Sequence, residues 1–105
     1  MTIDEPTTNA GAKHDAGKLL AGCLLDFPRA LQAVAGVSTF GAQKYSRGSW
    51  QSVPDGLTRY RDAQVRHMLA GAIDERDDEG GLLHAAHEAW NALAVLELKL
   101  REVKK

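Results

Sequence analysis

Residues 77–87 read Asp77-Asp78-Glu79-Gly80-Gly81-Leu82-Leu83-His84-Ala85-Ala86-His87, an acidic turn that runs into a helix. The paired glycines let the chain reverse direction, so we expect the helices before and after the turn to pack antiparallel. His84 and His87 are three residues apart and share one face of the second helix. This stretch predicts a helical pair with a polar site near its turn.

Apolar residues recur at helical spacing on both sides of this turn. They predict helices over residues 27–45, 57–75 and 82–103. Asp26 and Asp55 are expected to cap the first two helices, with Pro28 in the first turn of helix one. No alternating strand pattern is present in the sequence. The predicted fold class is all-α, a compact bundle of three to four helices.

Length and composition set the class of protein. The 105 residues suit one domain, with residues 1–12 as a flexible N-terminal arm and 13–105 as a single helical, nucleotide-binding domain. A net charge of -1 gives no signature of stable nucleic-acid binding. The single cysteine, Cys23, and the lack of a membrane-length apolar run predict a cytoplasmic protein without a membrane partner. The third helix is apolar nearly all round, which predicts a homo-oligomer.

The histidines form the first candidate site. Antiparallel packing would bring His67, on the second predicted helix, to His84 and His87, with acidic residues of the turn beside them. Neutral imidazoles and carboxylates bind divalent metals, and imidazoles can also contact phosphate. The alternative is that each histidine is a satisfied or solvent-facing side chain and the acidic run a polar turn.

Cations and aromatics form the second candidate site, because nucleotide binding needs phosphate donors and flat stacking surfaces. The alternative is a solvated charged face with Trp50 in the core. The residues concerned are Lys44, Tyr45, Arg47, Trp50, Arg59, Arg61 and Arg66.

Four blocks in this order resemble the dATP/dGTP diphosphohydrolase N-terminal domain family, which occurs widely in bacteriophages. They are Lys13 to Lys18, Phe40 to Tyr45 with Trp50, Arg59 to His67, and Asp77 to Asn91. The resemblance implies metal-dependent hydrolysis of dGTP or dATP to the monophosphate and pyrophosphate, in the bacterial host cytoplasm if phage-encoded.

Site residues follow from the same resemblance. It implies catalytic roles for Glu79, His67 and His84, and a divalent Mg²⁺ or Mn²⁺ held by His67, Asp77, Glu79, His84 and His87. The nucleotide would be bound by Lys13, Asp15, Lys18, Lys44, Tyr45, Trp50, Arg59, Arg66 and Asn91.

A second function stays open because the sequence departs from the all-α pyrophosphatases. The first predicted helix lacks their Glu-x-x-Glu metal pattern and has no acidic residue between Asp26 and Asp55. The alternative is a phage protein that captures a nucleotide or cyclic nucleotide signal without cleaving it, as a sponge of an immune messenger would.

Overall fold

The structure is a computed structural model that describes residues 15–103. The predicted flexible arm, residues 1–12, lies outside this range, and so does Lys13, which was predicted to bind the nucleotide. In chain order the described residues form a 3-10 helix η1 (Ala21–Asp26), α1 (Pro28–Lys44), a 3-10 helix η2 (Ser49–Ser52), α2 (Gly56–Gly71) and α3 (His84–Val103). Within residues 15–103 there is no strand, only an isolated bridge between Arg76 and Leu83. The predicted all-α class is confirmed.

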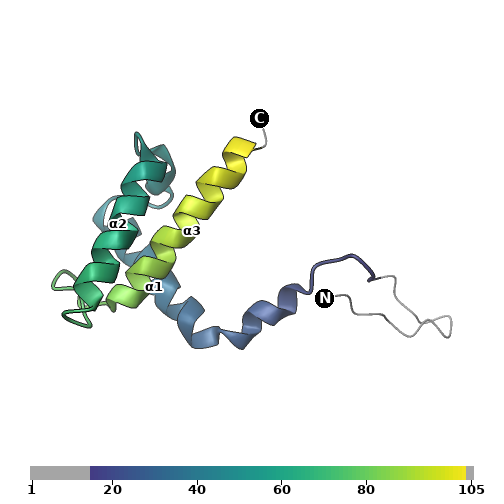
Figure 1. Cartoon of the computed structure of the whole chain (residues 1–105), viewed down its shortest axis with the longest axis horizontal. Helices are drawn as coiled ribbons and strands as arrows, with labels where there is room; N and C mark the ends of the chain where they lie inside the picture. The colour runs from purple at the N-terminus through teal and green to yellow at the C-terminus, as the bar shows by residue number, and fades with distance from the viewer. Residues whose placement is uncertain (1–14, 104–105) are drawn as a thin grey trace.

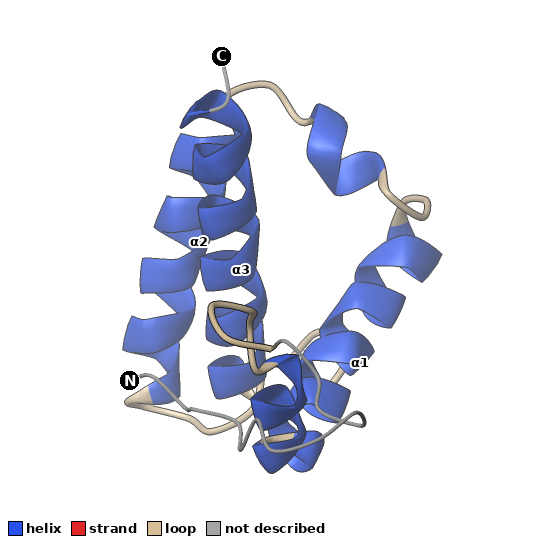
Figure 2. Cartoon of the chain, turned by 90° about the vertical axis from the view of Figure 1, so that its right-hand side faces the viewer, coloured by secondary structure: helices blue, strands red, loops and turns tan. Residues whose placement is uncertain are grey.

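Helices α2 and α3 lie side by side and form the body of the molecule (Figures 1 and 2). They are antiparallel because the turn reverses the chain, with Gly80 and Gly81 at φ 87 and 70, angles that glycine adopts without strain. The C-terminal part of α1 packs against α3. Among the helices formed by residues 15–103, none is both long enough and apolar enough to cross a bilayer.

Helix ends differ from the sequence predictions at three places. The second helix ends at Gly71 rather than at residue 75, because the following residues enter the turn that Arg76 and Leu83 close. Phe27, not Asp26, is the N-cap of α1, with Pro28 in the first turn as predicted. Asp55 is the N-cap of α2, but it makes no side-chain capping hydrogen bond. In addition, residues 21–26, which lie outside the predicted helices, form η1.

The buried apolar core is small. It consists of Val37 from α1 and Ala86, Ala94 and Val95 from α3, and no large side chain among residues 15–103 is fully buried. Small alanines let the helices approach closely, but they bury little area each. The core of this chain therefore leaves much apolar surface uncovered.

An aromatic cluster joins η2 to the helix pair. Trp50, Tyr60 and Trp90 meet edge to face, with ring centroids 5.5–6.0 Å apart. The Tyr60 hydroxyl donates a 2.6 Å hydrogen bond to the carbonyl of Trp50, and Trp90 Nε1 donates one of 2.8 Å to Ser38 Oγ. These contacts join η2, α2, α3 and α1.

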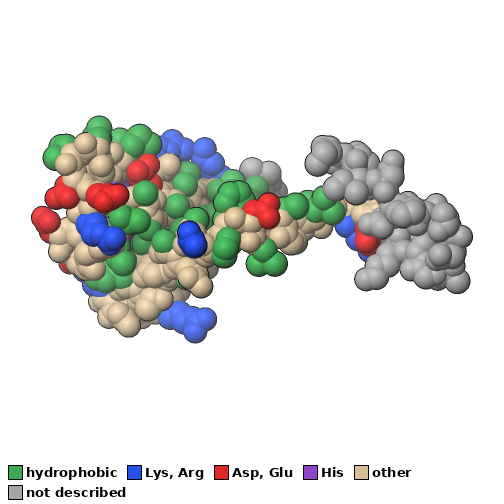
Figure 3. All heavy atoms as spheres, turned by 90° about the horizontal axis from the view of Figure 1, so that it is seen from below, with side chains coloured by type: hydrophobic (Ala, Val, Ile, Leu, Met, Phe, Trp, Pro, Cys, Tyr) green, Lys and Arg blue, Asp and Glu red, His purple; other side chains and the backbone are tan. Residues whose placement is uncertain are grey.

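The N-terminal part of the described chain projects from this body (Figures 1 and 3). We call residues 19–31, which comprise η1 with its flanks and the first turn of α1, the leucine segment. Figure 3 shows apolar side chains over much of the narrow projection. Those of the leucine segment are exposed: Leu19, Leu20, Leu24, Leu25, Phe27 and Leu31.

Candidate functional site

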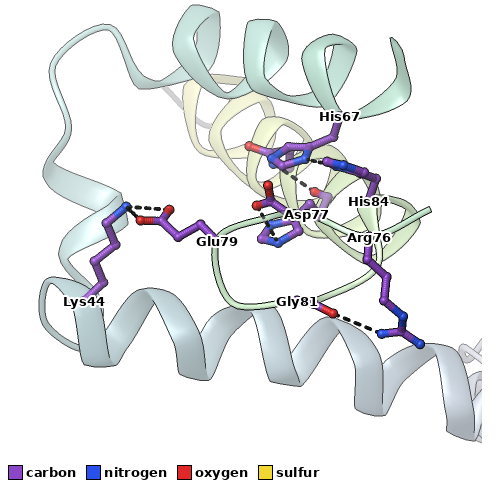
Figure 4. A network of polar contacts seen from close by, with 9 residues as sticks. Lys44, His67, Arg76, Asp77, Glu79, Gly81 and His84 are labelled. Carbon is purple, nitrogen blue, oxygen red and sulfur yellow. Dashed lines mark hydrogen bonds and ion pairs between the residues drawn. The ribbon is translucent and has the colours of Figure 1, made fainter. Parts of the chain in front are cut away.

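Three histidines meet between α2 and α3, as the sequence predicted (Figure 4). His67 comes from α2, and His84 and His87 come from the first turn of α3. The Nδ1 atoms of His67 and His84 are 2.9 Å apart. The rings of His67 and His87 stack with centroids 4.3 Å apart and planes within 6°. Because His84 and His87 are buried, this histidine cluster is an interior feature rather than a solvated face.

The turn supplies a carboxylate to the cluster. Asp77 Oδ2 lies 3.7 Å from His87 Nε2, which is buried and has no hydrogen-bond partner among residues 15–103. Backbone hydrogen bonds hold the turn in place: Asp77 N–H donates to Leu82 O at 2.8 Å, and Gly81 N–H donates to Asp77 O at 3.1 Å. His87 Nε2 is thus a buried polar atom that a proton, water or ligand could satisfy.

Burial affects the protonation of two histidines of the cluster, His67 and His87. It lowers the pKa of His67 and of His87, because desolvation disfavours the charged imidazolium. Neighbouring histidines lower both pKa values further, whereas Asp77 opposes the shift. Near neutral pH these imidazoles are therefore uncharged, and each can accept a proton.

An open hollow of about 280 Å³ lies beside the cluster. His84 and Asp77 line it together with acidic residues at the ends of the turn, and Arg76 contributes the one cation of its lining. The Arg76 guanidinium also donates a 3.0 Å hydrogen bond to Gly81 O (Figure 4). The lining residues are Ala70, Ile73, Asp74, Arg76, Asp77, Asp78 and His84.

The five predicted metal ligands do not all come together. The Glu79 carboxylate is 2.9 Å from Lys44 Nζ and points toward α1 rather than to the histidines (Figure 4). An imidazole binds a metal through a lone pair in the plane of its ring, and the parallel, stacked planes of His67 and His87 share no point where one ion could sit. Among residues 15–103, no group of three or more potential ligands is placed to hold a metal ion.

The predicted nucleotide-binding residues are dispersed. Lys44 pairs with Glu79, which raises the Lys44 pKa, and lies 5.3 Å from the ring of exposed Tyr45. Arg66 is exposed on α2, and Arg59 contacts Pro54 O at 3.4 Å at the start of the same helix.

Three further predicted residues lie in two separate parts of the described chain. Trp50 packs in the aromatic cluster. Asp15 and Lys18, 4.0 Å apart, precede the leucine segment, outside the helical body. The structure therefore does not gather these side chains around the histidines. The exception is Asn91, which is buried one turn after His87 and donates a 2.8 Å hydrogen bond to the His87 carbonyl.

Two residues of the site were missed from the sequence. Arg76 lines the hollow, and its sequence signal is that it is the single cation inside the acidic run 74–79. The Phe40 ring meets His87 edge to face, with centroids 6.4 Å apart. Nothing in the spacing of Phe40 distinguishes it from an ordinary core position of α1.

The fold and the site define an all-α domain with a buried histidine cluster beside an acidic turn. Residues 8–105 match the family described as dATP/dGTP diphosphohydrolase, N-terminal, and the chain belongs to this family. A protein of Salmonella phage PMBT28, named dATP/dGTP diphosphohydrolase, is 44% identical over 89 residues. That match covers 84% of this chain and 29% of the phage protein, so the chain spans less than a third of its relative. No solved structure matches the chain.

Proposed function

We propose that this chain contributes to the hydrolysis of dATP or dGTP to the deoxynucleoside monophosphate and pyrophosphate. Membership of the family and the name of the phage relative support this substrate class. The observation that carries the proposal is the buried histidine cluster with Asp77 at the edge of an open hollow. Groups that accept a proton near neutral pH are what activation of a water molecule requires.

His84 is the proposed general base. It lines the hollow, and its Nδ1 faces Nδ1 of His67 at 2.9 Å, so one of the two rings donates its N–H to the other. That contact fixes the orientation of the His84 ring, as a partner behind a catalytic imidazole does. Water in the hollow would lose a proton to His84 and attack the α-phosphorus. The bond from that phosphorus to its bridging oxygen would break, with pyrophosphate leaving.

Arg76 is the proposed phosphate partner, because it is the cation that lines the hollow. A guanidinium matches phosphate oxygens in shape and charge. The acidic side chains around it would repel a bare triphosphate. A cation that accompanies the nucleotide would relieve this repulsion.

Dependence on a divalent metal stays part of the proposal, in a narrower form. Mg²⁺ and Mn²⁺ prefer oxygen ligands to imidazoles, and the stacked rings of His67 and His87 do not suit one shared ion. We therefore propose that Mg²⁺ or Mn²⁺ arrives bound to the triphosphate rather than held by the five predicted residues. The histidines then act as proton acceptors and not as ligands.

The test is incubation of the pure chain with a panel of dNTPs, NTPs and cyclic nucleotides, with Mg²⁺ or Mn²⁺ and with EDTA, followed by chromatography. We expect monophosphate and pyrophosphate from dATP or dGTP, and loss of turnover in His84→Ala. Glu97→Gln is the control, because Glu97 pairs with Arg101 farther along α3 at 2.9 Å. A nucleotide that is bound and returned intact after denaturation would contradict hydrolysis and favour the sponge.

A further inference from the structure

Two apolar surfaces are left exposed by the packing of residues 15–103. One is the leucine segment, where exposure ranges from 40% at Leu31 to 92% at Leu19. The other, which we call the α3 stripe, consists of Ala89, Leu93, Leu96 and Leu100, spaced four, three and four residues apart on one exposed face of α3. Together they hold nine of the fourteen exposed large apolar side chains among residues 15–103. Patches of this kind on a small domain mark association surfaces.

We propose that the leucine segment of one chain covers the α3 stripe of a second copy, reciprocally, in a two-fold dimer. The two surfaces match in length. From Leu20 to Leu31 the chain rises about 18 Å, counting 3-10 and α-helical residues. The stripe spans about 16 Å from Ala89 to Leu100. Each copy gives one segment and receives one, so the assembly closes at two chains.

Charge also suits this pairing. Between residues 19 and 31 only Asp26 and Arg29 are charged, and none of the four positions of the α3 stripe is charged. Interface centres are depleted of charged side chains in the same way. Neither surface carries a cluster of charged side chains that a peptide or protein of opposite charge could bind.

The segment cannot cover the stripe of its own chain in this fold. Helix α1 is continuous from Pro28 to Lys44, and its C-terminal part is held against α3 by the hydrogen bond between Ser38 and Trp90 and by the contact of Phe40 with His87. The leucine segment, at the other end of α1, is carried away from α3 (Figure 1). A second copy supplies the missing surface without bending α1, and this holds whether or not the chain hydrolyses nucleotides.

The first test is the mass of the full chain by sedimentation and light scattering. We expect about twice the 11.4 kDa of one chain. Leu25→Asp in the segment and Leu96→Asp in the stripe should each weaken dimerisation by about 30-fold or more, as loss of a central apolar contact does. Leu69→Asp is the matched control, because Leu69 is an exposed leucine of α2 on neither surface, and it should leave the dimer intact. A wild-type monomer at high concentration would overturn the proposal.

The second test uses Cys23, the single cysteine, which is exposed within the leucine segment. A second cysteine is placed in turn at Leu93, Leu96 and Leu100, with Leu69→Cys as the control. Under mild oxidation at least one stripe variant should form a disulfide between Cys23 and the new cysteine of the other chain, because disulfides form only between neighbouring residues.

Peptide mapping identifies which two cysteines form the disulfide. It works equally for variants that associate but become poorly soluble. Links between the Cys23 residues alone would mean that segment pairs with segment, and would overturn the proposal. A link within one chain would overturn it as well, because it would show that the segment folds back.

Discussion

His67 and His84 face each other across the α2–α3 interface with their Nδ1 atoms 2.9 Å apart. One ring must donate its N–H and the other accept it, so the pair holds one shared proton between its two helices. The contact is at once a link between α2 and α3 and the support of the proposed general base.

His84→Ala should therefore lower stability as well as turnover. It leaves His67 Nδ1 without its partner in a partly buried place, which costs about 1–3 kcal/mol of unfolding free energy. Urea unfolding measures the loss. His84→Asn, whose amide can still meet His67, should recover part of the stability but none of the turnover. Full activity in His84→Asn would remove His84 from the role of base.

The pH dependence of stability follows from the lowered pKa values of His67 and His87. Below about pH 6.5 the unfolded chain binds protons that the folded chain does not. The folded state is therefore most stable, with respect to these two histidines, above that pH. Its unfolding free energy decreases as the pH falls toward the folded-state pKa values. Unfolding free energies measured between about pH 7.5 and pH 5.5 should decrease, with a smaller slope in His87→Gln. Equal slopes would contradict this assignment.

The features that could be predicted from the sequence depend mainly on residues that are close together in the chain. The meeting of His67 with His84 and His87 depends on helical spacing and on one glycine turn, and both can be recognised in sequence. The pairing of Glu79 with Lys44 joins residues 35 apart, and the choice of that partner depends on where α1 packs. The second helix ends early for a similar reason, because Arg76 pairs with Leu83 across the turn. No periodicity encodes such contacts.

The environment of Trp50 also depends on contacts that the sequence pattern does not reveal, and it leads to a further prediction. A Trp between cations suggests a stacking surface, yet its ring packs between Tyr60 and Trp90. Trp50→Ala should therefore cost about 2–4 kcal/mol of unfolding free energy, as truncation of a largely packed aromatic does. Tyr45→Ala, at a ring that is 72% exposed, should change it by less than about 0.5 kcal/mol. Comparable losses in the two variants would contradict the core assignment.

Substitutions at Gly80 and Gly81 separate backbone strain from steric clash within one turn. Both have positive φ, at 87 and 70, so alanine is strained at either position. A Cβ at Gly81 would meet nothing within 4 Å, whereas one at Gly80 would lie 2.8 Å from Phe40 Cε1. Gly81→Ala should cost about 1–2 kcal/mol, and Gly80→Ala about 1–3 kcal/mol more from the clash.

Phe40→Leu tests that difference, because it removes the ring edge that the new methyl group would meet. In this background the two alanine variants should approach each other in unfolding free energy, which a double-mutant cycle measures. The Phe40 ring also lies against His87, so Gly80→Ala should disturb the histidine cluster and lower turnover more than Gly81→Ala does. Equal costs of the two variants in the wild-type background would show that Phe40 moves aside freely, and that the turn does not fix the position of His87.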